Sequence, residues 1–198
     1  MRTIYVIFSY GAISGLSFIK RDAELNCSEN LSSFYINSMK FQIKKVNSLE
    51  RAWVKEIVLS WGAEFIVTRG RKVYPTEIDG FYAEDTKGNK IGLVTYEISG
   101  EQCEIVTLDA FIKFHGIGTA LLEKVKSEIS ALGCKRLCLI TLNDNLDAIR
   151  FYQKREMTIA TIHINALDES RRLKPTIAKI GQYGIPIRDE IEFEMLFI

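Results

Sequence analysis

Gly116 and Gly118 form a glycine pair between a run of apolar residues and a stretch with the spacing of an amphipathic helix. Such a turn leaves backbone N–H groups unpaired at the positive end of a helix, where an anion can bind. Further along the chain, Asn145 and Tyr152 add an amide and a phenol to a second short helical pattern. Together these residues predict a protein that holds a phosphate-bearing molecule and carries out proton transfer beside it.

Two other phosphate-binding loops do not fit this pattern. A dinucleotide fingerprint has three glycines in a βαβ unit, whereas the strands before Gly116 follow one another as in a meander. A Walker loop has Lys and then Ser or Thr after its last glycine, and no such pair follows Gly118. Anion binding by backbone N–H groups of the turn remains, and the residues concerned are Gly116, Ile117, Gly118, Thr119 and Ala120.

The composition is that of an ordinary globular protein: of 198 residues, 47% are hydrophobic and 26% are charged. This length suits one domain, or one domain with an appendage. Lys and Arg number 26 against 25 Asp and Glu, so no net charge favours nucleic acid or an anionic membrane surface. We therefore expect neither as a partner.

The four cysteines and two histidines do not form a metal-site pattern. No CxxC pair is present, and neither His115 nor His163 has ligand spacing to a cysteine. Buried free thiols in a reducing cytosol are the simplest interpretation. We therefore expect a cytoplasmic protein without a metal site.

Residues 1–38 differ in character from the rest of the chain. Residues 3–19 carry no charged side chain, but they lack a signal-peptide cleavage site and are too short and too rich in Gly and Ser for a spanning helix. We expect residues 39–198 to form the domain, with residues 1–38 an appendage or the product of an upstream start. A role in membrane attachment or export and an integrated structural element are the alternatives.

One helix and several short strands are predicted before the glycine turn. Asn47 is a suitable N-cap with Glu50 three residues later, and Gly62 can end the helix. The apolar face of this helix is expected at residues four apart, namely Trp53, Ile57 and Trp61. The strands are expected at residues 41–46, 65–68, 80–84, 91–98 and 102–111.

After the glycine turn, helices and strands alternate. The helices are expected at residues 119–132, 147–154 and 166–173, and the strands at 136–141 and 157–164. The order strand–helix–strand predicts a parallel pair with a right-handed crossover. In the last segment apolar residues alternate with Glu190, Glu192 and Glu194, which predicts a final strand buried on one face only.

Three segments together resemble the GNAT superfamily of acetyl-CoA-dependent N-acetyltransferases. They are the strand Glu104–Ala110, the turn His115–Ala120, and the pattern Asn145-x-x-Ala148-x-x-Phe151-Tyr152. Over residues 39–198 the resemblance implies an α/β fold of the α+β type. It has a mixed, mostly antiparallel central sheet of about seven strands, flanked by helices and containing a central parallel pair.

The resemblance also implies roles for individual residues. His115 and the turn from Gly116 to Ala120 would cradle the pyrophosphate of acetyl-CoA, which is a cosubstrate. The backbone of Leu108 and Ala110 would hydrogen-bond the pantetheine arm, and Asn145 would contact the pantetheine or phosphate region. Tyr152 would protonate the departing coenzyme A thiolate.

A primary amine must lose a proton before it can attack a thioester. For a lysine-like amine with a pKa of ~10.4, the neutral form at pH 7 costs about 4.6 kcal/mol, which a general base can offset. Glu104 and Asp109 are the candidates: the resemblance favours Glu104, while Asp109 lies nearer the expected thioester. They are an odd number of residues apart, so a regular strand points them to opposite faces, and only a bulge can bring both to the cleft.

The chain departs from the family pattern in three places. Lys113 stands where Gln or Arg is usual, Phe114 and His115 stand where Gly and a basic residue are common, and Glu156 begins the segment that usually starts with Gly-Phe. None of these changes removes a backbone N–H group, so cofactor binding should persist. Because His115 titrates where Arg would not, we expect acetyl-CoA affinity to weaken as the imidazole loses its proton.

The expected function is transfer of an acetyl group to a small-molecule or peptide amine by direct attack, in a monomer or homodimer. The early helix and strands would shape the acceptor pocket with Trp61, Arg69, Arg71 and Tyr74. The two arginines could select an acidic acceptor, although a surface role is an equal alternative. A non-catalytic acyl-CoA-binding or regulatory module on the same fold is the competing hypothesis.

Overall fold

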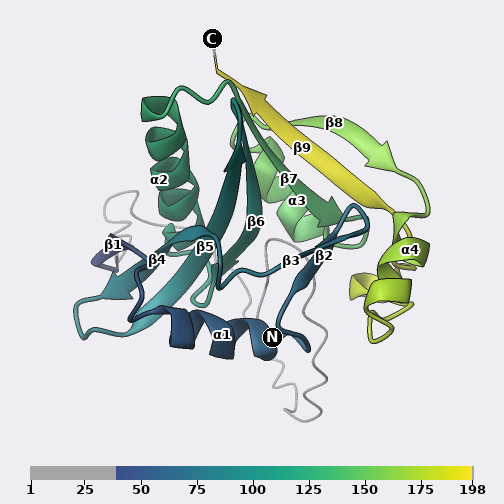
Figure 1. Cartoon of the computed structure of the whole chain (residues 1–198), viewed down its shortest axis with the longest axis horizontal. Helices are drawn as coiled ribbons and strands as arrows, with labels where there is room; N and C mark the ends of the chain where they lie inside the picture. The colour runs from purple at the N-terminus through teal and green to yellow at the C-terminus, as the bar shows by residue number, and fades with distance from the viewer. Residues whose placement is uncertain (1–38, 198) are drawn as a thin grey trace, which may run out of the picture.

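The computed structural model describes residues 39–197, and its centre is a seven-stranded sheet (Figure 1). The strand order is β1-β4-β5-β6-β7-β9-β8. These strands are β1 (Phe41–Lys45), β4 (Asp79–Asp85), β5 (Lys90–Ser99), β6 (Gln102–Ala110), β7 (Arg136–Leu142), β8 (Thr158–His163) and β9 (Glu190–Leu196). A separate hairpin joins β2 (Ile66–Thr68) to β3 (Arg71–Val73). The predicted appendage, residues 1–38, lies outside the described residues.

Helices cover both faces of the sheet. They are α1 (Arg51–Leu59), α2 (Ile117–Ala131), α3 (Leu146–Gln153) and α4 (Ala166–Leu173), and the chain also has a short 3₁₀ turn, η1 (Gln182–Gly184). On one face, α2 and α3 meet, because a Cβ on Gly118 of α2 would lie 3.4 Å from the Phe151 ring of α3 and 3.9 Å from Ala110 Cβ of β6. On the other face, the Trp53 ring of α1 packs against Tyr82 of β4 at 5.9 Å.

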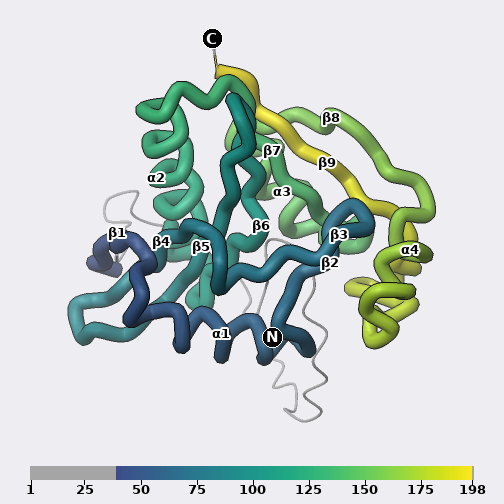
Figure 2. Tube along the Cα trace, in the orientation of Figure 1, coloured from purple at the N-terminus to yellow at the C-terminus, as the bar shows by residue number. Residues whose placement is uncertain are grey.

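The β2–β3 hairpin and α4 lie on the same face as α1. The hairpin lies in front of β7 and β9 and extends towards α4, which it contacts (Figure 2). The buried Lys174, just after α4, donates from Nζ to Trp61 O of the α1 region at 3.0 Å. The α1 region and the α4 region, which are far apart in the sequence, therefore cover the same face of the sheet.

The predicted parallel pair is confirmed for β6 and β7, which are joined through α2. All other neighbours in the sheet are antiparallel. The C-terminal strand β9 inserts between β7 and β8, so β8 is not a direct neighbour of β7. The mixed, mostly antiparallel sheet flanked by helices is therefore the one expected.

The first helix begins later than its predicted N-cap. Asn47 Oδ1 accepts from Leu49 N at 2.9 Å and Glu50 Oε2 accepts from Asn47 N at 3.2 Å, so these side chains close a turn that precedes α1. Val54 and Val58 are the fully buried positions of the helix, while the predicted Trp53 and Ile57 are partly buried against the core and Trp61 is buried just after the helix. The capping signals placed the start of the helix only to within a turn, and the partner surface decides which side of the helix is buried.

The prediction that β9 is buried on one face only is wrong. Glu190 is 0% exposed and Glu192 is 6% exposed, because the hairpin and α4 cover this face of the strand. Both carboxylates find partners there, since Ser170 Oγ donates to Glu190 at 3.3 Å and Arg136 donates to Glu192 at 2.7 Å. Alternation indicated the strand correctly but could not show that its polar face is also covered.

Gly92 of β5 lies directly beneath α2, and we expect Gly92→Ala to destabilise the fold by about 1–3 kcal/mol. A Cβ at this position would lie 2.6 Å from Ile117 Cγ2 and 3.0 Å from Asp109 O, so the helix would have to move. Chemical denaturation measures the loss. Ile117→Ala in the same background removes the atom in conflict and should restore part of the stability in a double-mutant cycle. A Gly92→Ala protein as stable as its parent would contradict this packing.

Candidate active site

A β-bulge in β6 brings the two candidate carboxylates to the same side of the sheet. Glu104 pairs with Glu97 of β5 and Asp109 pairs with Leu93, so five steps along β6 match four steps along β5. Because the separation on β5 is even, both carboxylates face α1 and the hairpin. Along the strand they lie about 13 Å apart, which is too far for both to contact one reacting atom.

β6 and β7 pair at only one end of their length. The parallel ladder begins at Gln102 and Arg136 and ends at Ile105 and Leu139. β6 nevertheless continues to Ala110, beyond the last pair. The two strands therefore diverge, and the ladder edges of β6 and β7 that face each other are unpaired beyond this point.

The backbone of Leu108 and Ala110 points into the space between the diverging strands. Phe111 N donates to Ile91 O of β5 at 2.9 Å. In an antiparallel ladder the bonded residues alternate, so the N–H and C=O groups of Ala110 and Leu108 turn away from β5 and towards β7. An extended ligand could form strand-like hydrogen bonds there.

The glycine turn leads directly into α2. Gly116 occupies the N-cap position with a φ of +79°, a left-handed conformation that favours glycine. Ala120 donates its N–H to Gly116 O at 2.9 Å, which corrects the expectation that this amide binds an anion. By helix geometry the amides directed out of the first turn belong to Gly116, Ile117, Gly118 and Thr119.

A cavity of about 330 Å³ opens in front of this turn. Ala110 of β6 and the first residues of α2, Gly116–Thr119, line one side of it. One stripe of α3 lines the other side, with the i, i+3/4, i+7/8 spacing of a helix face that continues past its C-terminus: Asp147, Arg150, Phe151, Lys154 and Arg155. The predicted anion-binding turn therefore borders a real cavity.

Four cations line the cavity: Lys113, which the sequence marked only as a departure from the family pattern, and Arg150, Lys154 and Arg155, which it did not single out. Asp147 is the single acidic residue in the lining, so the formal charge is strongly positive. The spacing of Arg150 and Lys154, one helical turn apart, is a signal that could have identified them. The spacing alone does not show which face of α3 is turned to α2, so it could not place these two residues at a cavity.

Arg155 is the best fixed of these cations. Its guanidinium lies 3.5 Å from the centroid of the Phe151 ring, and it donates to Thr119 Oγ1 from Nε at 3.1 Å and to Phe151 O at 2.8 Å. Stacking on an aromatic ring and hydrogen bonding hold the guanidinium plane in place. Arg155 therefore stands beside the amides of the α2 turn.

The cavity lining does not include two other predicted cofactor residues, His115 and Asn145. His115 is exposed, and its Nδ1 lies 2.6 Å from Lys113 O. Asn145 is the N-cap of α3, where its Oδ1 accepts from Ala148 N at 3.2 Å. Asn145 thus has a structural role that explains its position at the start of the helix.

Tyr152 is buried within the α2 and α3 face of the sheet. Its side chain is 0% exposed and packs between the rings of Phe151, at 5.2 Å, and Phe193, at 5.7 Å. It does not line the cavity, although its neighbour Phe151 does.

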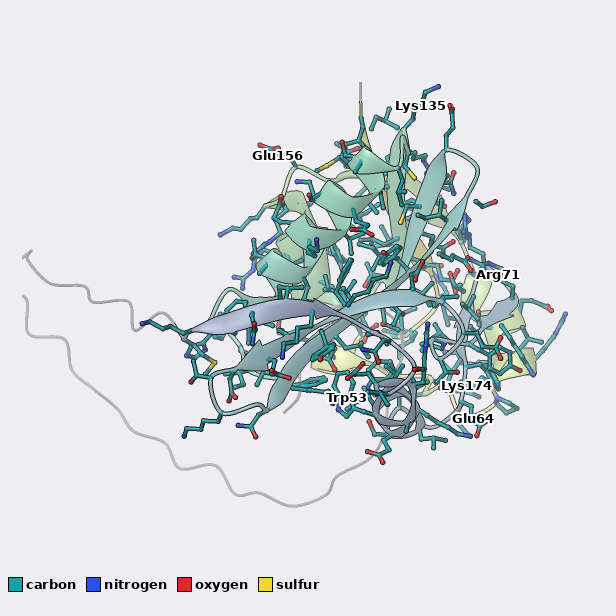
Figure 3. The ribbon with its side chains drawn as sticks, turned by 60° about the vertical axis from the view of Figure 1, so that its left-hand side comes forward. Trp53, Glu64, Arg71, Lys135, Glu156 and Lys174 are labelled. Atoms are coloured by element: carbon teal, nitrogen blue, oxygen red, sulfur yellow. The ribbon has the colours of Figure 1, made fainter. Side chains whose placement is uncertain are left out.

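Glu104 is held by two arginines from the hairpin region. Arg71 donates to Glu104 Oε2 at 2.7 Å, Arg69 forms a second ion pair with it, and Thr68 Oγ1 donates at 3.3 Å. Arg71 also pairs with Glu97. Figure 3 places Arg71 on the side of the sheet opposite Glu156, which follows α3.

The two arginines are therefore engaged with carboxylates of the protein itself. This corrects the suggestion that Arg69 and Arg71 select an acidic acceptor. The other two residues expected at the acceptor pocket differ in burial: Trp61 is buried, while Tyr74 is partly exposed and packs on Phe65 at 6.0 Å.

The two buried glutamates of β9 have pKa values shifted in opposite directions. Burial raises the pKa of Glu190 by more than the hydrogen bonds from Arg69 N and Ser170 Oγ lower it, so the pKa lies above its usual value. Burial also acts to raise the pKa of Glu192, but hydrogen bonds from Arg136 and His163 outweigh it and hold that pKa below its usual value of 4.5.

We expect these shifts to give opposite pH dependences of stability. Above pH 4.5 the folded state binds more protons at Glu190 than the unfolded state does, so the native protein loses stability as pH rises. Glu190→Gln has no carboxylate to ionise and so avoids this loss of stability. The melting temperature of the variant minus that of the parent should therefore increase as pH rises above 4.5. For Glu192, stability is present above pH 4.5 and is lost as pH falls, so Glu192→Gln should be destabilising at neutral pH and progressively less so in acid.

Thermal melts of the parent and both variants across pH 3–8 measure these differences. The two variants are matched controls, because each replaces a buried glutamate of the same strand. A difference in melting temperature that stays constant with pH for both variants would contradict the assignment.

Two kinds of feature are absent from residues 39–197 of the structure. No three His, Cys, Asp or Glu side chains of this region are grouped so as to hold a metal ion. No helix of the same region is long and apolar enough to cross a membrane.

Comparison with known proteins links this geometry to one family. Residues 50–157, more than half of the chain, match the Acetyltransferase (GNAT) family. The uncharacterized protein YdhI of Bacillus subtilis (strain 168) is 50% identical over 117 residues, which cover 59% of this chain and 73% of YdhI.

Solved structures share the fold at low sequence identity. The IAA acetyltransferase from Bacillus cereus ATCC 14579 superposes with a TM-score of 0.59 at 18% identity, covering 80% of this chain and 100% of that one. A GNAT family acetyltransferase from Elizabethkingia anophelis with acetyl-CoA bound gives a TM-score of 0.59 at 21% identity, covering 79% of this chain and 98% of that one. The chain belongs to the GNAT family of acetyltransferases.

Proposed function

We propose that this protein transfers the acetyl group of acetyl-CoA to a primary amine by direct attack. The observation that carries the proposal is the divergence of β6 and β7 beyond Ile105 and Leu139, which opens beside a cationic cavity at the α2 turn. A pyrophosphate at the turn and an extended pantetheine arm along β6 would bring the thioester towards the last strand pair.

The binding part of this proposal rests on complementary chemistry. The amides of the α2 turn and the guanidinium of Arg155 are suited to a pyrophosphate. The outward-facing backbone of Leu108 and Ala110 is suited to the amides of pantetheine. These groups fit acetyl-CoA as a cosubstrate without a metal ion.

The chemical part assigns two proton transfers. The neutral amine nitrogen attacks the thioester carbon, the C–S bond breaks, and an amide and a coenzyme A thiolate form. Glu104, next to the last pair of β6 and β7, would accept the proton of the amine directly or through one water. Tyr152 would donate a proton to the thiolate and recover it from solvent.

Release of free coenzyme A tests the proposal directly. Purified protein is incubated with acetyl-CoA and a panel of amines, namely amino acids, polyamines, aminoglycosides and peptides with free N-termini, and thiol is measured with a colorimetric reagent. Acceptor-dependent thiol release, with acetylated product confirmed by mass spectrometry, is the expected result. Reactions without acceptor correct for hydrolysis.

A regulatory acyl-CoA-binding module is the second candidate. Two observations favour it: Tyr152 is fully buried, and Glu104 is already held by Arg69 and Arg71. Acetyl-CoA binding measured by calorimetry, without thiol release for any acceptor in the panel, would favour this module over the enzyme.

Arg155→Ala is expected to weaken acetyl-CoA binding by about 10- to 100-fold, because charge-assisted hydrogen bonds contribute about 1.5–3 kcal/mol. Arg155→Lys keeps the charge but loses the planar stack on Phe151, so it should give an intermediate affinity. Isothermal titration calorimetry measures both, with the exposed Arg172→Ala as a control. An Arg155→Ala protein with the parental affinity would exclude this contact.

A further inference from the structure

Thr141 of β7 is a buried threonine whose hydroxyl has no hydrogen-bond partner among residues 39–197. Its side chain is 0% exposed, and Oγ1 is out of contact with solvent. Thr95 of β5 is a matched case, because it is also buried but its Oγ1 lies 2.7 Å from Oγ1 of Thr107. A buried hydroxyl without a partner is costly, so folded proteins nearly always supply one. The exception at Thr141 points to a bound molecule as the acceptor.

Thr141 lies in the part of β7 that has separated from β6. The ladder between these two strands ends at Leu139, two residues earlier. Side chains two residues apart on a strand share a face, so Thr141 is on the same face as Leu139 and about 7 Å further along. Thr141 therefore belongs to the segment beside which the proposed acyl arm would lie.

The face of the sheet that carries Thr141 also carries Tyr152. Leu139 pairs with Phe193 of β9, and the Tyr152 ring packs on Phe193 at 5.7 Å. Paired residues on neighbouring strands point to the same face, so Thr141, Leu139, Phe193 and the Tyr152 ring are all on one side of the sheet.

Glu104 is on the opposite side of the same strand pair. It pairs with Cys138 of β7, the neighbour of Leu139, and successive residues of a strand point to opposite faces. The end of the β6 and β7 ladder thus has a carboxylate on one face and two hydroxyls on the other. A base on one side and hydrogen-bond donors on the other suit a reaction in which a nucleophile enters from one face and a leaving group departs towards the other.

Given the proposed function, we infer that the Thr141 hydroxyl donates a hydrogen bond to the sulfur of coenzyme A as the C–S bond breaks. The amine would attack from the face of Glu104, and the sulfur would leave towards the face of Thr141 and Tyr152. A hydrogen bond to a thiolate is stronger than one to a thioester sulfur, so the contact lowers the barrier to bond cleavage. Tyr152 supplies the proton that the thiolate takes up, and Thr141 keeps its own.

Coenzyme A and desulfo-CoA, in which a hydrogen replaces the thiol, probe this contact without turnover. Calorimetry across pH 6–9 gives the ratio of the two affinities for the parent, Thr141→Val and Thr141→Ser. The preference of the parent for coenzyme A should increase with pH, because a thiolate accepts more strongly than a thiol. Thr141→Val has nearly the same shape without the hydroxyl and should reduce the preference at pH 9 by about tenfold, whereas Thr141→Ser should keep most of it.

Stability and turnover should change in opposite directions in Thr141→Val. Loss of a buried hydroxyl without a partner should raise the melting temperature of the ligand-free protein by about 2–4 °C, while kcat should fall by about tenfold. Thr95→Val is the matched control, because it leaves the Thr107 hydroxyl without its partner. This control should lower the melting temperature and keep the parental ratio of affinities.

The outcomes separate this inference from the proposed function. If the parent binds neither compound, the proposed function fails together with the inference. If the parent binds both compounds with equal affinity at every pH, or if Thr141→Val keeps the parental preference, Thr141 does not contact the sulfur and the proposed function stands. A Thr141→Val protein that is destabilised like Thr95→Val would also reject the inference, because the hydroxyl would then have its partner within the protein.

Discussion

Tyr152→Phe is expected to lower kcat by about 10²- to 10⁴-fold, the contribution typical of a positioned acid in the transition state. The phenolic hydroxyl is the only group removed, and the ring contacts with Phe151 and Phe193 remain. Because the side chain does not line the cavity, the Kd for acetyl-CoA should change by no more than about twofold. Steady-state kinetics with the acceptor identified in the thiol-release assay, together with calorimetry, measure the two quantities separately.

The dependence of the rate on the leaving group of the acyl donor provides a control for this assignment. An acyl donor whose thiol leaves more easily than coenzyme A needs less help from an acid, so it should recover part of the activity of Tyr152→Phe. A packing role for the phenol predicts no such recovery, and it predicts instead a lower melting temperature. Unchanged kcat in a correctly folded Tyr152→Phe protein would remove Tyr152 from the mechanism.

Local patterns were sufficient to predict most elements and the turn at Gly116. The predicted helix at residues 119–132 corresponds to α2 at Ile117–Ala131, and the helix at residues 166–173 is α4. These segments combine apolar periodicity with a glycine or proline at an end, so the signals lie within a few residues of one another. The same holds for the turn proposed to bind an anion, since its outward-facing amides follow from the helix start itself.

Features that depend on distant residues could not be predicted. The bulge in β6 appears only when the register against β5 is known, and it decides the side to which Glu104 and Asp109 point. The role of Arg155 depends on the approach of α3 to Thr119 of α2. The burial of Glu190 depends on a hairpin and a helix far from it in the sequence. In each case the missing information is the choice of partner surface rather than a local preference.

We propose Glu104 rather than Asp109 as the proton acceptor because of the point at which β6 and β7 diverge. Glu104 precedes Ile105, the last residue of β6 that pairs with β7, whereas Asp109 lies about 13 Å away towards the cavity. A pantetheine arm that starts at the α2 turn would bring its thioester towards the strand pair, and so towards Glu104. Asp109 would then lie alongside the arm rather than at the reacting carbon.

Arg69 and Arg71 already donate to Glu104, which limits how an incoming amine can reach this carboxylate. A carboxylate that accepts from two guanidiniums has few lone pairs left for a third donor, so an incoming amine must displace one of them or act through a water. The exchange is electrostatically balanced if the acceptor arrives as an ammonium ion, since one cation replaces another. The proton can then leave the amine while the arginines hold the carboxylate in position.

Glu104→Gln is therefore expected to lower kcat/KM for the amine by about 10²- to 10⁴-fold at pH 7, with the Kd for acetyl-CoA unchanged. Because the variant lacks a proton acceptor, its rate should recover as pH approaches the pKa of the amine, where the neutral form is already abundant. Asp109→Asn, a matched change on the same face of β6, should keep the parental pH profile. A larger loss and an altered pH profile in Asp109→Asn, with parental kinetics in Glu104→Gln, would assign the proton transfer to Asp109 and place the thioester nearer to the α2 turn.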